Sequence, residues 1–122
     1  MTRIAIPVKS HSSRDDQVYG HFGKAPVYHV INDINDPSKD EALENKSNHF
    51  DGELSPPDFL NSKHIDVLIT SSIGKGAYNK LNIHGVKIYR TKKQSIADIL
   101  REYSENKLEI MSEDMAHSHK KH

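Results

Sequence analysis

Nine histidines and no cysteine define the metal chemistry open to this chain of 122 residues. Without thiolates, the chain can form no disulfide and lacks the usual sulfur ligands of zinc and iron–sulfur sites. Any metal binding must therefore use imidazole, carboxylate or thioether groups. The placement of the histidines decides which of them are candidates.

His21 is the first candidate, in the segment VYGHFGKAPVY at residues 18–28. Gly20 and Gly23 permit positive φ angles and close backbone approach, so this turn can present the imidazole at a sheet edge with its ring free to bind. An ordinary tight turn, with Phe22 in the core and His21 in water, explains the same residues. His21 is therefore a candidate ligand with a purely structural alternative.

A second candidate is the segment SSIGKG at residues 71–76, between a predicted strand and a predicted helix. Free N–H groups and the dipole at a helix start favour anions, and ligands of α/β sheets bind at the carboxyl ends of strands. The segment matches neither a Walker loop nor GxGxxG, and a connection that merely needs small residues is the alternative. Together with Gly23, the candidate cofactor-binding residues are Ser71, Ser72, Gly74, Lys75 and Gly76.

The end of the chain carries a third candidate, the H-x-H-x-x-H pattern of His117, His119 and His122. Imidazoles at this spacing can reach one Ni²⁺, Cu²⁺ or Zn²⁺ ion. A solvated tail or a purification remnant is the alternative interpretation. We expect divalent metal affinity at this tail.

The charge balance argues against nucleic acid and membrane partners, because 17 basic residues match 17 acidic ones. No run reaches the roughly 18 apolar residues of a membrane span, and MTRIAIPVKS is too short in its apolar part for a secretory signal. We therefore expect a cytoplasmic protein, with one folded domain at residues 1–109 and a flexible tail at 110–122.

An enzymatic role is not expected. A nuclease with a ribonuclease H type of sheet needs clustered carboxylates, one of them in the first strand, to hold two Mg²⁺ ions, whereas the first strand here is RIAIPV. No serine lies on a nucleophile elbow. The candidate residues therefore favour binding over catalysis.

Short apolar, β-branched runs predict the strands that position these residues, and apolar residues at helical spacing predict the helices. Ser55 and Ser95 are expected to cap helices, and Gly85 to end one. The order predicts a mixed sheet of about five strands with helices on both faces, an α/β class. Strands are expected near 3–8, 26–31, 65–70 and 86–90, with an edge strand within 41–50, and helices near 55–63, 73–84 and 95–104.

Four stretches resemble the dinitrogenase iron-molybdenum cofactor biosynthesis family, which includes NifX and the C-terminal part of NifB. They are RIAIPV, GHFGKAPVY, DVLITSSIGKGAYNKLNIHGVKIYR and SIADILREYSENKLE, and the likeness spans about residues 2–109. The resemblance implies a ribonuclease H-like three-layer α/β/α fold without catalysis. It also implies that His21 is a cluster ligand and that residues 71–76 line the same cleft.

The leading hypothesis is a non-enzymatic carrier or scaffold for an iron–sulfur or iron-molybdenum cofactor precursor-like cluster, or for a related anionic metal complex. Its partners would be proteins that donate or accept the cluster. Since relatives often supply cysteines and this chain has none, we expect transient binding. The alternatives are a metal-ion chaperone that uses the histidine tail, and a regulatory protein-interaction domain without metal.

Overall fold

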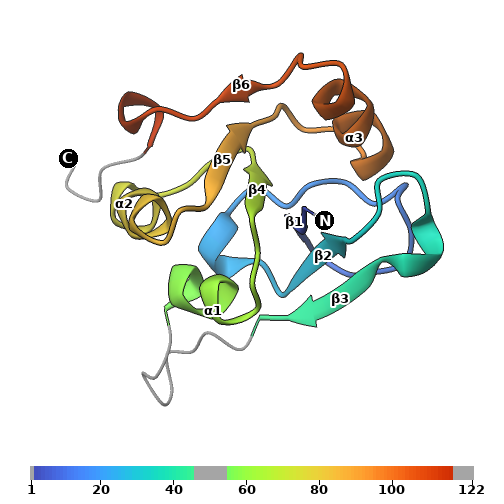
Figure 1. Cartoon of the computed structure of the whole chain (residues 1–122), viewed down its shortest axis with the longest axis horizontal. Coiled ribbons are helices and arrows are strands. Elements are labelled where there is room, and N and C mark those ends of the chain that lie inside the picture. The colour runs from blue at the N-terminus through green and yellow to red at the C-terminus, as the bar shows by residue number, and fades with distance from the viewer. Residues whose placement is uncertain (1, 46–54, 117–122) are drawn as a thin grey trace.

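The computed structural model describes residues 2–45 and 55–116. Its centre is a six-stranded sheet in the order β3-β2-β1-β4-β5-β6 (Figure 1). The strands are β1 (Ile4–Val8), β2 (Val27–Ile31), β3 (Glu41–Glu44), β4 (Val67–Thr70), β5 (Lys87–Arg90) and β6 (Glu109–Ile110). The helices are α1 (Pro56–Ser62), α2 (Lys75–Ile83) and α3 (Ile96–Ser104). None of these helices, in the residues described, is long and apolar enough to cross a membrane.

The sheet is mixed, as predicted. β1 pairs in parallel with β4, and β4 with β5, while β2, β3 and β6 join by antiparallel pairing. The predicted count of about five strands is wrong, because β6 adds a sixth. β6 has only two residues, too few for an alternating pattern to be recognised.

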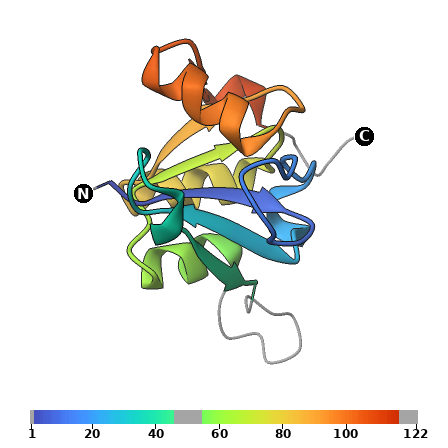
Figure 2. The same cartoon turned by 90° about the vertical axis from the view of Figure 1, so that its right-hand side faces the viewer.

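Helices cover both faces of the sheet (Figure 2). On one face, Phe59 and Leu60 of α1 and Leu81 of α2 pack in one buried cluster with side chains of the sheet. On the other face, α3 buries Ile96 and Ile99 in a second cluster. The two clusters divide the core into two apolar layers, with the sheet between them.

The helix ends follow the predicted signals. The Ser55 hydroxyl accepts a hydrogen bond from the Asp58 amide at 3.4 Å, and the Ser95 hydroxyl accepts one from the Asp98 amide at 3.2 Å. Gly85, just beyond α2, has a φ of 82°, a conformation that favours glycine. α2 differs at its start, where the N-cap Gly74 supplies no side-chain hydrogen bond.

The topological switch point of the sheet lies between the neighbouring strands β1 and β4, because the connections that follow these two strands lead to opposite sides of the sheet. β1 is followed by β2 on one side of the sheet, whereas β4 is followed by β5 on the other. The pairing between β1 and β4 is limited to Ile4 and Ala5 with their partners Val67 and Leu68, so the carboxyl ends of the two strands are not paired with each other. Sheets of this kind bind ligands in the crevice at such a point.

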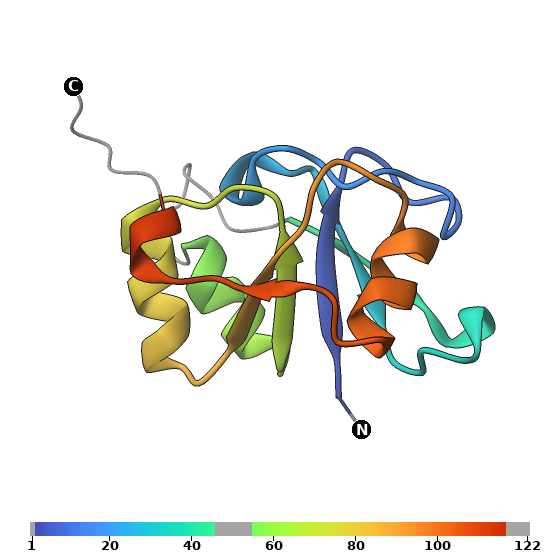
Figure 3. The ribbon, with the colours of Figure 1, turned by 90° about the horizontal axis from the view of Figure 1, so that it is seen from above.

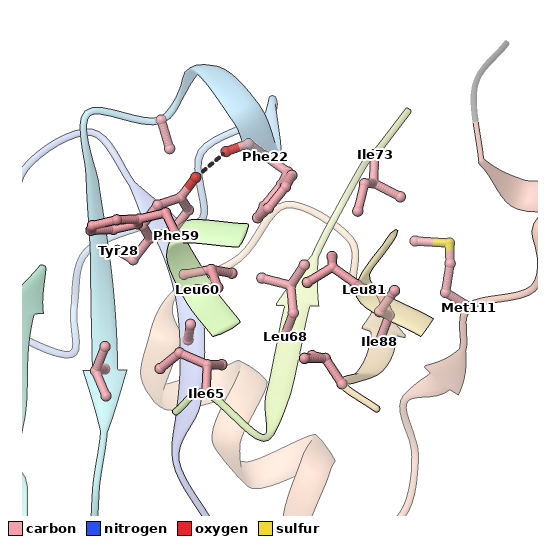
Figure 4. Close-up of a cluster of buried hydrophobic side chains, with 14 of the residues drawn as sticks. Phe22, Tyr28, Phe59, Leu60, Ile65, Leu68, Ile73, Leu81, Ile88 and Met111 are labelled. Carbon is pink, nitrogen blue, oxygen red and sulfur yellow. Dashed lines mark hydrogen bonds between the residues drawn. The ribbon is translucent and has the colours of Figure 1, made fainter. Parts of the chain in front are cut away.

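The folded part of the chain extends beyond residue 109, where the tail was expected to begin. Met111 is 5% exposed and belongs to the cluster under α1 and α2 (Figure 4). Its carbonyl accepts a hydrogen bond from the Tyr78 hydroxyl at 3.3 Å, and Ala116 is also buried. Residues 110–116 therefore belong to the domain, and sequence periodicity missed them because a single buried methionine makes no period.

Candidate functional site

A pocket of about 290 Å³ lies at the carboxyl edge of β1 and β4. One wall is the segment that leads from β1 into β2, and the other is the connection from β4 into α2. Figure 3 shows both connections along the same edge of the sheet, opposite the N-terminus. The lining residues are His21, Phe22, Gly23, Lys24, Pro56, Ser72, Ile73, Gly74 and Ala77.

Phe22 anchors the first wall in the hydrophobic core, where it is 2% exposed. The Tyr28 hydroxyl donates a hydrogen bond of 2.9 Å to the Phe22 carbonyl (Figure 4). The Asn45 amide donates to the carbonyls of Gly23 and Ala25 at 3.2 and 2.8 Å. The carbonyls of Phe22, Gly23 and Ala25 are thus held by the core residue Tyr28 and by Asn45, the residue after β3.

His21 is exposed directly before this anchored residue. Its backbone is extended, with φ −122° and ψ 111°, and it precedes the short 3-10 helix Phe22–Lys24. Its ring meets that of Tyr19 edge-on, with the centroids 6.3 Å apart. The imidazole therefore lies at the pocket on extended backbone, directly before the buried Phe22.

Gly20 and Gly23 do not use the positive φ angles that glycine permits. Gly85 is the one described glycine in that region of backbone space. A Cβ added to Gly23 would lie 3.5 Å from Cγ of Pro56, in ordinary contact. Gly23 thus lies next to the start of α1 and has an ordinary backbone conformation.

The second wall is the connection of residues 71–74. Ile73 is 2% exposed and anchors it in the core, while the Thr70 hydroxyl donates a hydrogen bond of 3.2 Å to the Ser72 carbonyl. Gly74 then begins α2 without a side-chain cap. The first helical turn therefore receives no side-chain cap from Gly74, and its amides lie at the positive end of the helix dipole.

Among residues 2–45 and 55–116, the lining of the pocket contains a lysine, a histidine and no carboxylate. Lys24 is the cation, and sequence reasoning missed it; its position three residues after the candidate ligand His21 was the available signal. Phe22, Pro56, Ile73 and Ala77 add an apolar floor. An apolar pocket with one cation, one imidazole and an uncapped helix start suits an anionic ligand.

Of the predicted site residues, the pocket brings together His21, Gly23, Ser72 and Gly74. Lys75 and Gly76 lie in the first turn of α2 but do not line it. Ser71 lines a different pocket, with Arg90 and Thr91 near the end of β5. The predicted metal ligands His117, His119 and His122 lie outside the described residues.

In residues 2–45 and 55–116, no group of three or more histidine, cysteine, aspartate or glutamate side chains is arranged to hold a metal ion. A cluster bound at the pocket would therefore have one imidazole, backbone amides and a lysine as its contacts. Such a donor set fits a labile cargo better than a permanently coordinated metal.

Comparison with solved structures supports the fold. The orange protein of Desulfovibrio gigas, in its apo form, aligns with a TM-score of 0.75 and 20% identity, covering 92% of this chain and 94% of that one. A Thermotoga protein, provisionally described as a NifB protein, aligns with a TM-score of 0.73 and 28% identity, covering 90% and 93%. A Methanocaldococcus jannaschii protein, provisionally described as a dinitrogenase, gives 0.66 and 15%, covering 90% and 94%.

No curated protein sequence matches the chain. The sequence profile of the family described as dinitrogenase iron-molybdenum cofactor, in contrast, matches residues 2–106. That match runs from β1 to the end of α3 and includes both walls of the pocket. The chain belongs to the dinitrogenase iron-molybdenum cofactor family.

Proposed function

We propose that this protein is a non-enzymatic carrier that binds an anionic metal–sulfur cluster, of the iron–sulfur or iron-molybdenum cofactor precursor type, at the His21 pocket. The observation that carries the proposal is the joining of His21, Lys24 and the uncapped start of α2 around one apolar pocket. Membership of a cofactor family agrees with such a cargo. The ribonuclease H-like label is likewise our proposal for the fold.

Electrostatics favour this cargo. A negatively charged cluster would meet the positive end of α2 and the Lys24 ammonium group. A helix N-terminus contributes about 0.3–1 kcal/mol per favourable charge at low salt, so binding should weaken as the salt concentration rises.

A single imidazole and no thiolate point to reversible binding. Thiolates are the common ligands of iron–sulfur clusters, and this chain has none. The pocket can therefore accept a preassembled cluster and release it to a protein that offers stronger ligands. Donor and acceptor proteins of this kind are the partners that we propose.

Anaerobic titration with a preformed, soluble iron–sulfur cluster tests the function, with visible absorbance and gel filtration as readouts. We expect the cluster to co-elute with the wild-type chain and to dissociate from the His21→Ala variant. His64→Asn is a matched control, because His64 is exposed at the amino end of β4 and has a φ of 60°, which asparagine tolerates. Equal retention of the cluster by all three proteins would refute the proposed site.

A further inference from the structure

A partly buried ion-pair network lies on the α3 face of the sheet, away from the pocket. The Arg14 guanidinium donates two hydrogen bonds of 2.8 Å to the two carboxylate oxygens of Asp40. The same carboxylate lies 2.7 Å from Nε2 of His29, in the middle of β2. Arg14 also donates to the carbonyls of Asp33 and Ile34. The network thus joins residues 9–16, which we call the strap, to β2 and to the connection before β3.

His29 is the unusual member, because it is 1% exposed and its Nδ1 atom has no hydrogen-bond partner among the residues that the structure describes. A buried polar atom without a partner is rare in folded proteins. The ring of His11, an exposed strap residue, lies over His29 with the centroids 4.3 Å apart. The strap therefore covers the imidazole.

The network has a definite charge state at neutral pH. Burial would raise the pKa of Asp40, but the hydrogen bonds from Arg14 and His29 outweigh burial and hold that pKa below its usual value. Burial lowers the pKa of His29 below 6.5, against the opposing effect of Asp40. Arg14 and Asp40 are thus a charged pair, and His29 is neutral and donates its Nε2 proton to the carboxylate.

We propose that the His29–Asp40–Arg14 network is a proton-sensitive latch that holds the strap on the sheet at neutral pH and releases it on acidification. The proposal concerns the opposite face of the sheet and does not depend on the cargo. It predicts a local opening of residues 9–16, with β1 to β5 still paired.

Protonation of His29 would place an N–H group at Nδ1, where the described residues offer no acceptor. The groups that face this site from the strap are His11, Arg14 and Asp16, and Asp40 faces it from the connection before β3. Of these groups, Arg14 carries a positive charge that opposes a second positive charge on His29. The Asp16 carboxylate is already engaged by the amides of Ser12 and Ser13 and by the Ser12 hydroxyl. Moving the strap aside lets water reach Nδ1 and separates the two imidazoles.

The sign of the pH dependence follows from linkage. Since the folded protein binds the His29 proton less readily than the unfolded chain does, the contribution of His29 to stability is complete above pH 6.5 and decreases as the pH falls below that value. Acid therefore weakens the closed strap, and neutral pH restores it.

The strap also caps α3, which provides a readout. The Arg14 carbonyl accepts a hydrogen bond from the Ala97 amide at 2.8 Å, and the Asp16 carbonyl accepts one from the Ile96 amide at 2.9 Å. Release of the strap exposes these two amides to solvent. Their hydrogen-exchange protection factors, corrected for the intrinsic effect of pH, report strap opening directly.

The test compares these protection factors at pH 7.5 and pH 5 in the full chain. We expect a loss of about tenfold in the protection of Ile96 and Ala97 at the lower pH. His29→Gln keeps an amide donor near Asp40 but cannot titrate, so its protection should be independent of pH. In the control His84→Gln, which removes a half-exposed histidine paired with Asp58 at 2.9 Å, the wild-type dependence should remain.

Unchanged pH dependence in His29→Gln would overturn the latch. If His29→Gln does not fold, the ring nitrogen shifts of His29 in the wild-type protein decide. The latch requires His29 to titrate below pH 6.5, in step with the loss of Ile96 and Ala97 protection. Titration at or above 6.5, or titration without loss of protection, contradicts it.

Discussion

At the scale of single residues, the neighbours His21 and Phe22 have opposite environments. Phe22 is buried in the core, and its carbonyl is tied to the Tyr28 hydroxyl. His21 is exposed at the pocket and makes no side-chain cap hydrogen bond to the 3-10 helix that follows it. Phe22 thus stabilises this wall, and His21 is the residue that we propose as the cluster ligand.

Substitution of the two neighbours should separate these roles. His21→Ala removes little burial, so the melting temperature should change by less than about 1 °C, while cluster affinity falls at least tenfold. Phe22→Ala should lower the free energy of unfolding by about 3–5 kcal/mol, because it leaves a cavity in the core. Thermal melts and anaerobic cluster titrations check both variants, and a large drop in melting temperature for His21→Ala would identify it as a structural residue.

At the scale of elements, α2 is the helix whose start serves the pocket. α1 and α3 are capped by Ser55 and Ser95, whereas Gly74 leaves the first turn of α2 uncapped. A helix start without a side-chain cap is less stable than a capped one, and its positive dipole end still favours an anion. In the proposed function, the start of α2 that lacks a side-chain cap contributes to binding of the anionic cluster.

Gly74→Asp should therefore have opposite effects on stability and binding. An aspartate at this position caps the helix and complements its dipole, so the free energy of unfolding should rise by about 0.5 kcal/mol. The same carboxylate repels an anionic cluster, so affinity should fall at least tenfold. Ser95→Asp, at the start of α3, is the control with a new charge at a helix start away from the pocket; an equal loss of cluster affinity there would show a nonspecific effect of charge.

The ends of the helices could be predicted from the sequence because the signals that mark them are local. The caps at Ser55 and Ser95 and the stop at Gly85 need only a few neighbouring residues to be recognised. The pocket was predicted in part, because strand order brings the ends of β1 and β4 to one edge. Lys24 and Pro56 were missed as lining residues, since their approach depends on how α1 packs against residues 21–24.

At the scale of the whole molecule, the domain ends later than periodicity predicts. Residues 110–116 add a buried methionine, an edge strand residue and a short 3-10 helix to the structure. The His29 network was also missed, because a histidine in an apolar strand carries no sign of a carboxylate eleven residues away in the chain. Both features depend on tertiary packing, which local patterns do not encode.

Two shortened chains test the boundary. A chain that ends at Ile110 should be less stable than one that ends at Ala116 by at least about 2 kcal/mol, since it loses the buried Met111 side chain. Urea denaturation of both chains measures the difference, and equal midpoints would contradict the assignment of residues 111–116 to the domain.

Titration of the chain that ends at Ala116 with Ni²⁺ also tests the predicted histidine tail, because metal binding should largely disappear.

The central claim is that residues of the His21 wall and of the residue 71–74 wall form one cargo site. A double-mutant cycle tests it most directly, with His21→Ala, Gly74→Leu and the combined variant titrated anaerobically with the same iron–sulfur cluster. Because Gly74 lines the pocket, a leucine there should block the approach of the cluster that His21 contacts. The account predicts that the double variant loses clearly less affinity than the sum of the two single losses, as residues of a shared site do. Strictly additive losses would contradict it and assign the two residues to separate sites.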